Sequence, residues 1–147
     1  KKELLVVCER CRGADRPPYY KLPGGALHPK EHLADGVIRE VFEETGVPTH
    51  FEGLICFRHW HGYRYGKSDI YFVCRLKPLK QVIEMQVSEI EECFWMPVSE
   101  YMQSEHVSVF NKQIVNAAID HTGLEQTFVE GYGDPDQYEF FMPDPSS

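Results

Sequence analysis

The stretch that decides the fold is GALHPKEHLADGVIREVFEETGV, residues 25–47. Its apolar positions, including Leu33, Val37 and Val41, recur at the spacing of one buried face of an α-helix. Gly46, with a proline two residues further on, is a signal that ends a helix. The stretch therefore predicts a loop followed by an amphipathic helix that ends at Gly46.

On both sides of this stretch, short apolar runs alternate with turn-forming residues. Runs of this kind, bounded by Gly, Pro and polar residues, predict short strands, and they cover residues 4–8, 19–22, 51–60, 69–76 and 93–96. A second helix is predicted over residues 107–119. Strands interspersed with two helices indicate an α/β or α+β sandwich.

The length of 147 residues suits one domain, and we expect it over residues 1–124, followed by a partly ordered tail over residues 125–147. Hydrophobic residues make up 42% and charged residues 26% of the chain, which argues against disordered and fibrous classes. No apolar run approaches the roughly 20 residues that span a bilayer. We expect an intracellular, cytoplasmic protein, unless a targeting segment precedes residue 1.

The net charge of −8 argues against nucleic-acid and membrane partners, because both are bound mainly through clustered Lys and Arg. The expected partner is a small phosphate-bearing molecule, and a homodimer is an open alternative. The five cysteines fit reduced thiols. Cys8 and Cys11 form a lone C-x-x-C, for which zinc or redox chemistry is the less favoured interpretation.

Three carboxylates mark the chemistry of the predicted helix. Glu40, Glu43 and Glu44 fall within about 100° of arc on one helix face, where their mutual repulsion calls for a cation. Oxygen ligands favour Mg²⁺ or Mn²⁺, and such ions promote hydrolysis of a phosphoanhydride. Arg39, four residues before Glu43, can pair with it and orient it. The alternative is a solvated helix face, which leaves the flanking glycines Gly25 and Gly46 unexplained.

The spacing of these residues resembles the Nudix box. Gly25, Glu31, the pair 39–40, the pair 43–44 and Gly46 occupy its fixed positions. The resemblance implies a Nudix-type α/β/α sandwich with a mixed β-sheet, and the activity of a Nudix pyrophosphohydrolase, an acid anhydride hydrolase. Within the family, the segments GKSD and CRLKP, at 66–69 and 74–78, are similar to the subgroup of the antisense basic fibroblast growth factor protein and its plant relatives.

The resemblance also implies roles for individual residues. The expected metal ligands are Gly25, Glu40, Glu43, Glu44 and Glu89, and the expected catalytic residues are Arg39, Glu43, Glu44 and Glu89. Glu89, six residues before Trp95, is expected to be a further metal ligand or the general base. His28 stands where relatives commonly carry another glutamate, and it either binds phosphate when protonated or is a loop residue.

Aromatic and basic residues between the two middle strands are the candidate substrate contacts. Trp60 and Tyr63 could stack on a nucleotide base, and Arg58 and Lys67 could bind phosphate; the alternative is an ordinary aromatic hairpin. We expect hydrolysis of the pyrophosphate bond in ADP-ribose, NADH or ADP-sugars. The alternatives are a diphosphoinositol polyphosphate or dinucleoside polyphosphate hydrolase, or a non-catalytic Nudix-fold module that binds a nucleotide or a partner.

Overall fold

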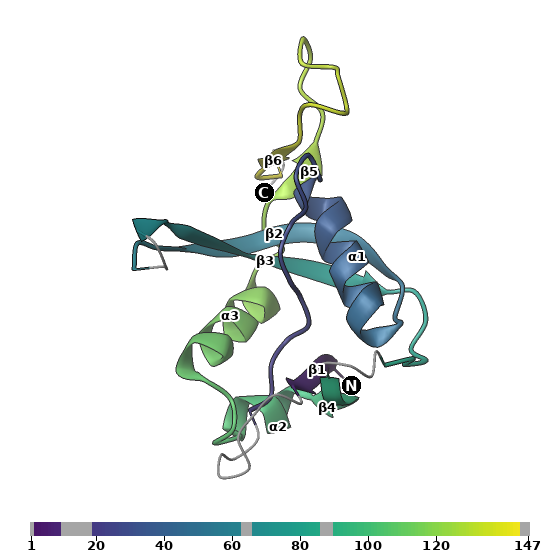
Figure 1. Cartoon of the computed structure of the whole chain (residues 1–147), viewed down its shortest axis with the longest axis vertical. Coiled ribbons are helices and arrows are strands. Elements are labelled where there is room, and N and C mark those ends of the chain that lie inside the picture. Colours follow the sequence, from purple (N-terminus) through teal and green to yellow (C-terminus); the bar gives the residue numbers. More distant parts are fainter. Residues whose placement is uncertain (1, 10–18, 63–65, 86–89, 145–147) are drawn as a thin grey trace. The chain divides into compact units, whose positions relative to one another are not determined.

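The computed structural model describes residues 2–9, 19–62, 66–85 and 90–144. The elements follow one another along the chain (Figure 1) as β1 (Glu3–Glu9), α1 (Leu33–Thr45), β2 (Thr49–Trp60), β3 (Asp69–Pro78), β4 (Ile90–Pro97), α2 (Val98–Gln103), α3 (Val109–Asp120), β5 (Glu125–Thr127) and β6 (Phe140–Met142). The chain divides into two compact units, Lys1–His50 with Pro78–Gln113 and Phe51–Lys77 with Ile114–Ser147.

In the first unit, β1 pairs antiparallel with β4, and Val7 lies opposite Cys93. The middle of β1 is buried, and α2 contacts both strands. Tyr101 of α2 is fully buried. Its hydroxyl donates to the Tyr20 carbonyl oxygen at 3.3 Å and accepts from Asn111 Nδ2 at 3.2 Å. A buried tyrosine whose hydroxyl is satisfied fixes the segment around Tyr20 against α2.

Helix α1 ends as its sequence predicts. Gly46 has φ of 74°, the left-handed conformation that glycine adopts without strain, and its N–H donates to the Phe42 carbonyl oxygen at 2.8 Å. Thr45 is fully buried, and its hydroxyl donates to the Val41 carbonyl oxygen at 2.7 Å. The Thr45 carbonyl oxygen accepts from the N–H of Glu84 at 2.7 Å. The end of the helix is thus joined to the segment that precedes β4.

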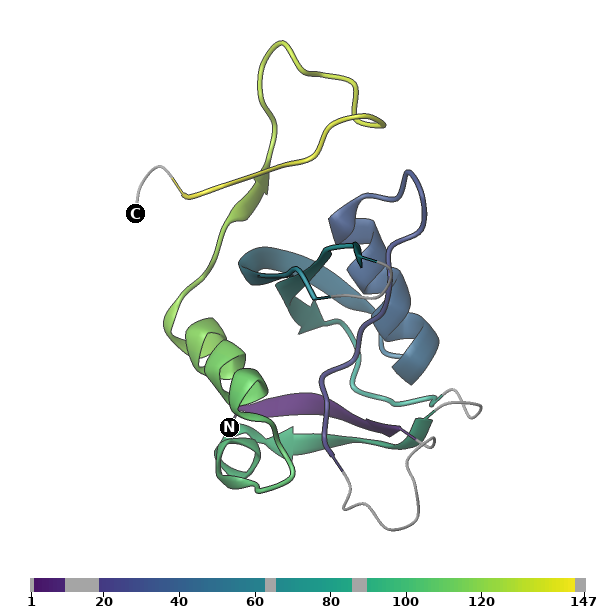
Figure 2. The same ribbon diagram turned by 60° about the vertical axis from the view of Figure 1, so that its left-hand side comes forward.

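In the second unit, β2 pairs with β3 and β5 pairs antiparallel with β6 (Figures 1 and 2). Leu54 of β2 and Leu124 exchange two backbone hydrogen bonds of 2.8 Å, which attach the segment before β5 to β2. Gly123, with φ of 81°, permits this approach, because a Cβ there would lie 2.6 Å from the Leu54 carbonyl oxygen. The Phe51 and Phe141 rings, 5.6 Å apart, add a side-chain contact.

The expected mixture of strands and helices is confirmed, and most predicted strands lie within one or two residues of the observed ones. The strand predicted over 19–22 reduces to an isolated bridge between Lys21 and Val7, because Pro23 at the next hydrogen-bonding position has no N–H for a ladder. The helix predicted over 107–119 begins at Val109. Helix α2 and the strands β5 and β6 were not predicted. Among the described residues, no helix has the length and apolar character to cross a bilayer.

Candidate active site

Arg39, in the middle of α1, uses all five of its N–H donors. Nε and Nη2 donate to the two carboxylate oxygens of Glu31 at 2.7 and 3.0 Å, and Nη2 also donates to the Ala26 carbonyl oxygen at 3.1 Å. Nη1 donates to Glu40 Oε2 and to Glu43 Oε1, both at 3.0 Å. Because a guanidinium has five N–H donors, the side chain is fully engaged, and the predicted pair with Glu43 is formed.

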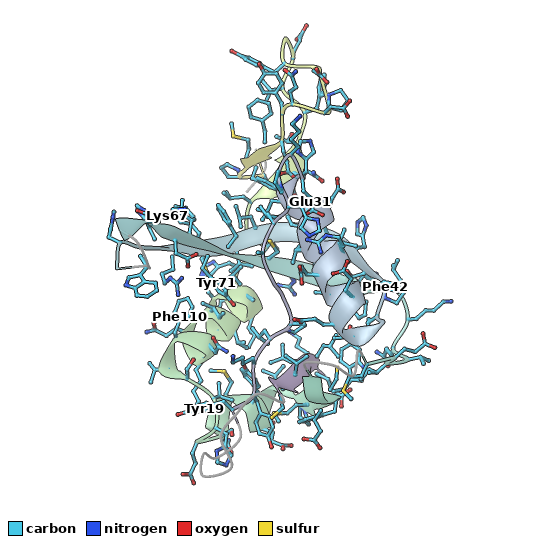
Figure 3. The ribbon with its side chains drawn as sticks, viewed as in Figure 1. Tyr19, Glu31, Phe42, Lys67, Tyr71 and Phe110 are labelled. Atoms are coloured by element: carbon cyan, nitrogen blue, oxygen red, sulfur yellow. The ribbon has the colours of Figure 1, made fainter. Side chains whose placement is uncertain are left out.

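Glu31, which Figure 3 labels at the upper end of α1, is the main partner of this arginine. The hydrogen bonds from Arg39, and then the one from the His28 backbone N–H at 2.9 Å, lower the pKa of Glu31 from 4.5 to about 2. The hydrogen bond to Glu31 in turn raises the pKa of Arg39. The pair is therefore fully ionised at neutral pH and ties the loop of residues 26–31 to the helix. The His28 side chain, the alternative phosphate contact, is exposed.

Two consecutive glycines lie against the carboxylates of α1. The Gly24 N–H donates to Glu44 Oε1 at 3.0 Å. A Cβ on Gly25 would lie 2.2 Å from Glu40 Oε1, whereas a Cβ on Gly24 would meet none of the described residues within 4 Å. Of the two glycines, Gly25 is the one at which a side chain would displace a carboxylate of α1. The glycine of the sequence motif therefore has a steric reason at the site itself.

Gly36, inside α1, is a residue that the sequence analysis did not single out. A Cβ there would lie 2.2 Å from Leu27 Cδ2 and 3.1 Å from Glu31 Oε1. Gly36 thus gives the loop the room to pack on the helix and deliver Glu31 to Arg39. The available signal was the glycine itself, since a glycine inside a helix costs about 1 kcal/mol relative to alanine and often has a packing reason.

The structure brings together the residues predicted from the box. Gly25, Arg39, Glu40, Glu43 and Glu44 lie on α1 and the loop that packs against it. Glu40 is 18% exposed at its side chain and Glu43 56%, so the former is the more enclosed carboxylate. Of the other predicted residues, Glu89 and Tyr63 lie outside the described residues, and Arg58, Trp60 and Lys67 belong to the second unit.

The donors at this site suit a hard cation. Carboxylate oxygens together with the backbone of a glycine are the ligand type that Mg²⁺ and Mn²⁺ take, and Gly25 places its backbone beside Glu40. Within the described ranges, no three His, Cys, Asp or Glu side chains are grouped so that they could hold a metal ion. Arg39 Nη1 donates hydrogen bonds to both Glu40 and Glu43. The positive charge that these two carboxylates contact is therefore the Arg39 guanidinium.

In the second unit, an arginine is enclosed by two aromatic rings. The Arg58 guanidinium lies 5.8 Å from the Trp60 ring centre and 5.2 Å from that of Tyr71, and it forms an ion pair with Asp69. Trp60 is 48% exposed and Tyr71 is 40% exposed. Tyr71 lies on β3, and Lys67, which is exposed, precedes that strand (Figure 3). Tyr71 and Asp69 were not predicted; their signal was their i, i+2 spacing, which puts them on one face of β3.

The described cysteines are free thiols. Burial raises the pKa of Cys93 to about 11, with a smaller contribution from the charge of Glu44. Burial raises the pKa of Cys74 to about 12, with a smaller contribution from the charge of Glu139. Burial also raises the pKa of Cys56. Since the thiolate is the reactive and metal-binding form, these three thiols are poor nucleophiles at neutral pH. Cys8 is buried, and Cys11, the second half of the C-x-x-C, lies outside the described residues.

The family model described as NUDIX domain matches residues 1–117. The chain is 45% identical over 106 residues to Nudix hydrolase 2 of Arabidopsis thaliana, covering 72% of this chain and 38% of that protein. It is 33% identical over 115 residues to nucleoside diphosphate-linked moiety X motif 6 of Homo sapiens, covering 77% and 35%. The chain thus spans less than two fifths of the length of these curated relatives.

Solved structures share the fold. The NUDIX hydrolase from Nitrosomonas europaea superposes with a TM-score of 0.66 at 24% identity, covering 82% of each chain. The NUDIX domain of Shewanella oneidensis NrtR, solved in complex with ADP ribose, superposes with a TM-score of 0.62 at 19% identity, covering 80% of this chain and 76% of that one. At these identities the likeness concerns the arrangement of the backbone.

Proposed function

Because this chain belongs to the Nudix family, we propose that it hydrolyses the pyrophosphate bond of a nucleoside diphosphate linked to another group, with Mg²⁺ or Mn²⁺ as cofactor. The observation that carries the proposal is the close approach of the Gly25 backbone to the carboxylate of Glu40, while the Gly24 N–H donates to Glu44 and holds that carboxylate in place. A solvated helix face would have no need of such an approach, whereas a site that holds a cation between backbone and carboxylate oxygens would.

The proposed reaction is a displacement at phosphorus. A water oxygen adds to one phosphorus, the bridging P–O bond breaks with its electron pair on the departing phosphate, and the proton of the water passes to a carboxylate. Mg²⁺ or Mn²⁺, when bound, supplies Lewis-acid stabilisation of the diphosphate charge. Gly25, Glu40 and Glu44 are the proposed ligands together with Glu43, and Glu89 is the proposed further ligand or general base.

Arg39 is proposed to act as a positioning residue. It has no donor left for a substrate, since its five N–H groups all bond within the loop and the helix. Its bonds to Glu40 and Glu43 fix where these carboxylates lie, and a cation that takes them as ligands must compete with the Nη1 contacts. The role of Arg39 is therefore to hold the carboxylates in place and to balance their charge.

For the substrate, we propose ADP-ribose, NADH and ADP-sugars as the first compounds to test. The exposed rings of Trp60 and Tyr71, fixed by Arg58 between them, provide flat surfaces suited to stacking of a base. Exposed Lys67, and Tyr63, are the other proposed contacts. The fold likeness to a NUDIX domain solved with ADP ribose makes ADP-ribose the natural starting point.

The test is a substrate panel with added MgCl₂ or MnCl₂, read by product mass. The panel contains ADP-ribose, NADH, an ADP-sugar, a diadenosine polyphosphate and a diphosphoinositol polyphosphate. We expect cleavage of a nucleoside diphosphate between its two phosphates. In Glu44→Gln, we expect kcat to fall by at least about a hundredfold, which is the size of effect seen when a group that stabilises the transition state is removed. The matched control is Glu105→Gln, which alters an exposed glutamate outside the box and should keep full activity.

Two outcomes would contradict the proposal. If folded Glu44→Gln hydrolysed the substrate as fast as the unaltered protein, Glu44 would not belong to the active site. If the panel compounds bound but none was cleaved with either metal, the chain would be a nucleotide-binding module of the Nudix fold.

A further inference from the structure

Four aromatic side chains lie on the loop between β5 and β6, in the yellow part of Figure 2, and on the first residue of β6. We call them the C-terminal aromatic surface, and they are Phe128, Tyr132, Tyr138 and Phe140. Phe128 is 73% exposed, Tyr132 51% and Tyr138 43%. Single exposed aromatic residues are common on proteins, but a contiguous exposed patch marks an interaction site more often. The proposed hydrolysis does not use these residues.

The rings are arranged against one another. Tyr138 and Phe140 are stacked, with ring centres 5.9 Å apart and an interplanar angle of 9°. The ring of Tyr132 meets both edge-on, at 5.3 Å and 81° from Tyr138 and at 5.8 Å and 72° from Phe140. Rings in this arrangement contribute beyond the area that they bury, so the surface exists before any ligand arrives.

The backbone beneath the rings is held by a turn. The Asp134 carbonyl oxygen accepts from the N–H groups of Gln137 and Tyr138 at 3.1 and 3.2 Å, and its carboxylate accepts from the Asp136 N–H at 3.0 Å. The Tyr132 N–H donates to the Val129 carbonyl oxygen at 3.1 Å. Since binding to a surface already in place costs little ordering entropy, the turn favours recognition of an external ligand.

The charge of this part of the chain is of one sign. Residues 122–147 contain no Lys, Arg or His, and six acidic residues, Glu125, Glu130, Asp134, Asp136, Glu139 and Asp144. A negative field of this kind repels nucleic acid and anionic membranes. It also disfavours a second copy of this chain, whose net charge is −8. Cations are attracted both by the carboxylates and by the faces of the aromatic rings.

We propose that the C-terminal aromatic surface docks a basic segment of a partner protein, with an Arg or Lys side chain seated on the rings of Tyr132, Tyr138 and Phe140. Arg is the favoured residue because its planar guanidinium stacks on aromatic rings and binds carboxylates in pairs of hydrogen bonds. The acidic residues of the segment, Glu130 and Asp136 among them, provide the complementary charge. This docking is independent of the proposed hydrolysis.

The test uses a peptide of four Gly-Arg repeats as probe, with a peptide of four Gly-citrulline repeats as its uncharged counterpart. Citrulline keeps the shape of arginine but not its charge. We expect the Arg peptide to shift backbone amide signals of residues 125–144 in an NMR titration at low salt, and the citrulline peptide to leave them unchanged. Added salt should weaken the binding, because exposed charges are screened.

Variants of the surface separate the rings from the charges. Tyr132→Ala should weaken binding by about two- to fivefold, the size of an exposed cation–π contact, whereas Tyr132→Phe should bind as the unaltered protein does. The double variant Glu130→Gln with Asp136→Asn keeps the rings and should weaken binding by a similar factor, about two- to fivefold. The control is Val109→Ala, which alters an apolar residue of α3 that is 76% exposed and should leave binding of the Arg peptide unchanged.

Three results would overturn the proposal. The first is equal binding of the Arg and citrulline peptides. The second is Arg-peptide binding that neither Tyr132→Ala nor the double charge variant weakens, with both folded by circular dichroism. The third is a dimer in sedimentation experiments that Tyr132→Ala abolishes, because the occupant of the surface would then be a second copy of the chain.

Discussion

Replacing Gly25 with alanine tests the site through a single methyl group. The new Cβ would lie 2.2 Å from Glu40 Oε1 and 2.4 Å from Glu40 Cδ, whereas ordinary contact begins at 3.4 Å. The carboxylate must therefore move by about 1.2 Å, at a cost of about 0.5–1.5 kcal/mol if its side chain leaves its rotamer. Because a misplacement of about 1 Å can lower a rate by about a hundredfold, we expect kcat/KM to fall by about ten- to a hundredfold.

Two readouts separate this effect from unfolding. Mn²⁺ binding, followed by electron paramagnetic resonance, should weaken in Gly25→Ala, while urea unfolding should show only the small loss given above. Gly24→Ala is the matched control, because a Cβ there meets no atom of the described part of the chain within 4 Å and the hydrogen bond from the Gly24 N–H to Glu44 is kept. The reasoning is refuted if folded Gly25→Ala binds Mn²⁺ as tightly as the unaltered protein, or if Gly24→Ala weakens Mn²⁺ binding equally.

Three further predictions concern the network behind the site. Arg39→Lys should lower the thermal midpoint in calorimetry, since an ammonium has three donors for five acceptors; an unchanged midpoint would show that the five bonds do not stabilise the protein. Glu31, whose pKa falls from 4.5 to about 2 on folding, contributes stability that is present above pH 4.5 and is lost as the pH falls through 2. The deficit of Glu31→Gln in urea unfolding should therefore shrink between pH 7 and pH 3, and a constant deficit would contradict the assigned cause. Gly46→Ala should cost more free energy of unfolding than the 1–2 kcal/mol, roughly, of a left-handed residue, because its Cβ meets the Glu84 backbone at 2.8 Å. Gly66→Ala, where φ is 71° and a Cβ would meet no described residue within 4 Å, should cost only that amount, and equal losses would count against the contact with Glu84.

The helix α1 could be predicted because its signals are local. The apolar period and the terminal Gly46 act within a few residues, and the i, i+4 spacing of Arg39 and Glu43 brings their side chains together on any regular helix. The strand predicted over 19–22 failed for a reason that is not local. A strand requires a partner along its whole length, and Pro23, two residues after Lys21 at the next hydrogen-bonding position, offers no N–H.

Other parts of the site depended on contacts between distant residues. The packing of Leu27 over Gly36 depends on how the loop folds back on the helix, which no periodicity shows. Tyr71 joins Trp60 around Arg58 only because β2 and β3 pair in one register, and the sequence does not fix that register. The length of β5 and β6, three residues each, is too short for a period of two to be recognised.

The five bonds of Arg39 also limit how this region can change in length. The guanidinium bonds to Ala26 and Glu31, which lie 13 and 8 residues before it, and to Glu40 and Glu43 on its own helix. The backbone and these hydrogen bonds together form closed rings of fixed size. One residue inserted between Ala26 and Arg39 would break ring closure, whereas an exposed loop outside the rings could absorb it at the small entropic cost of a longer loop. We therefore expect insertions to be tolerated outside residues 26–43 rather than within them.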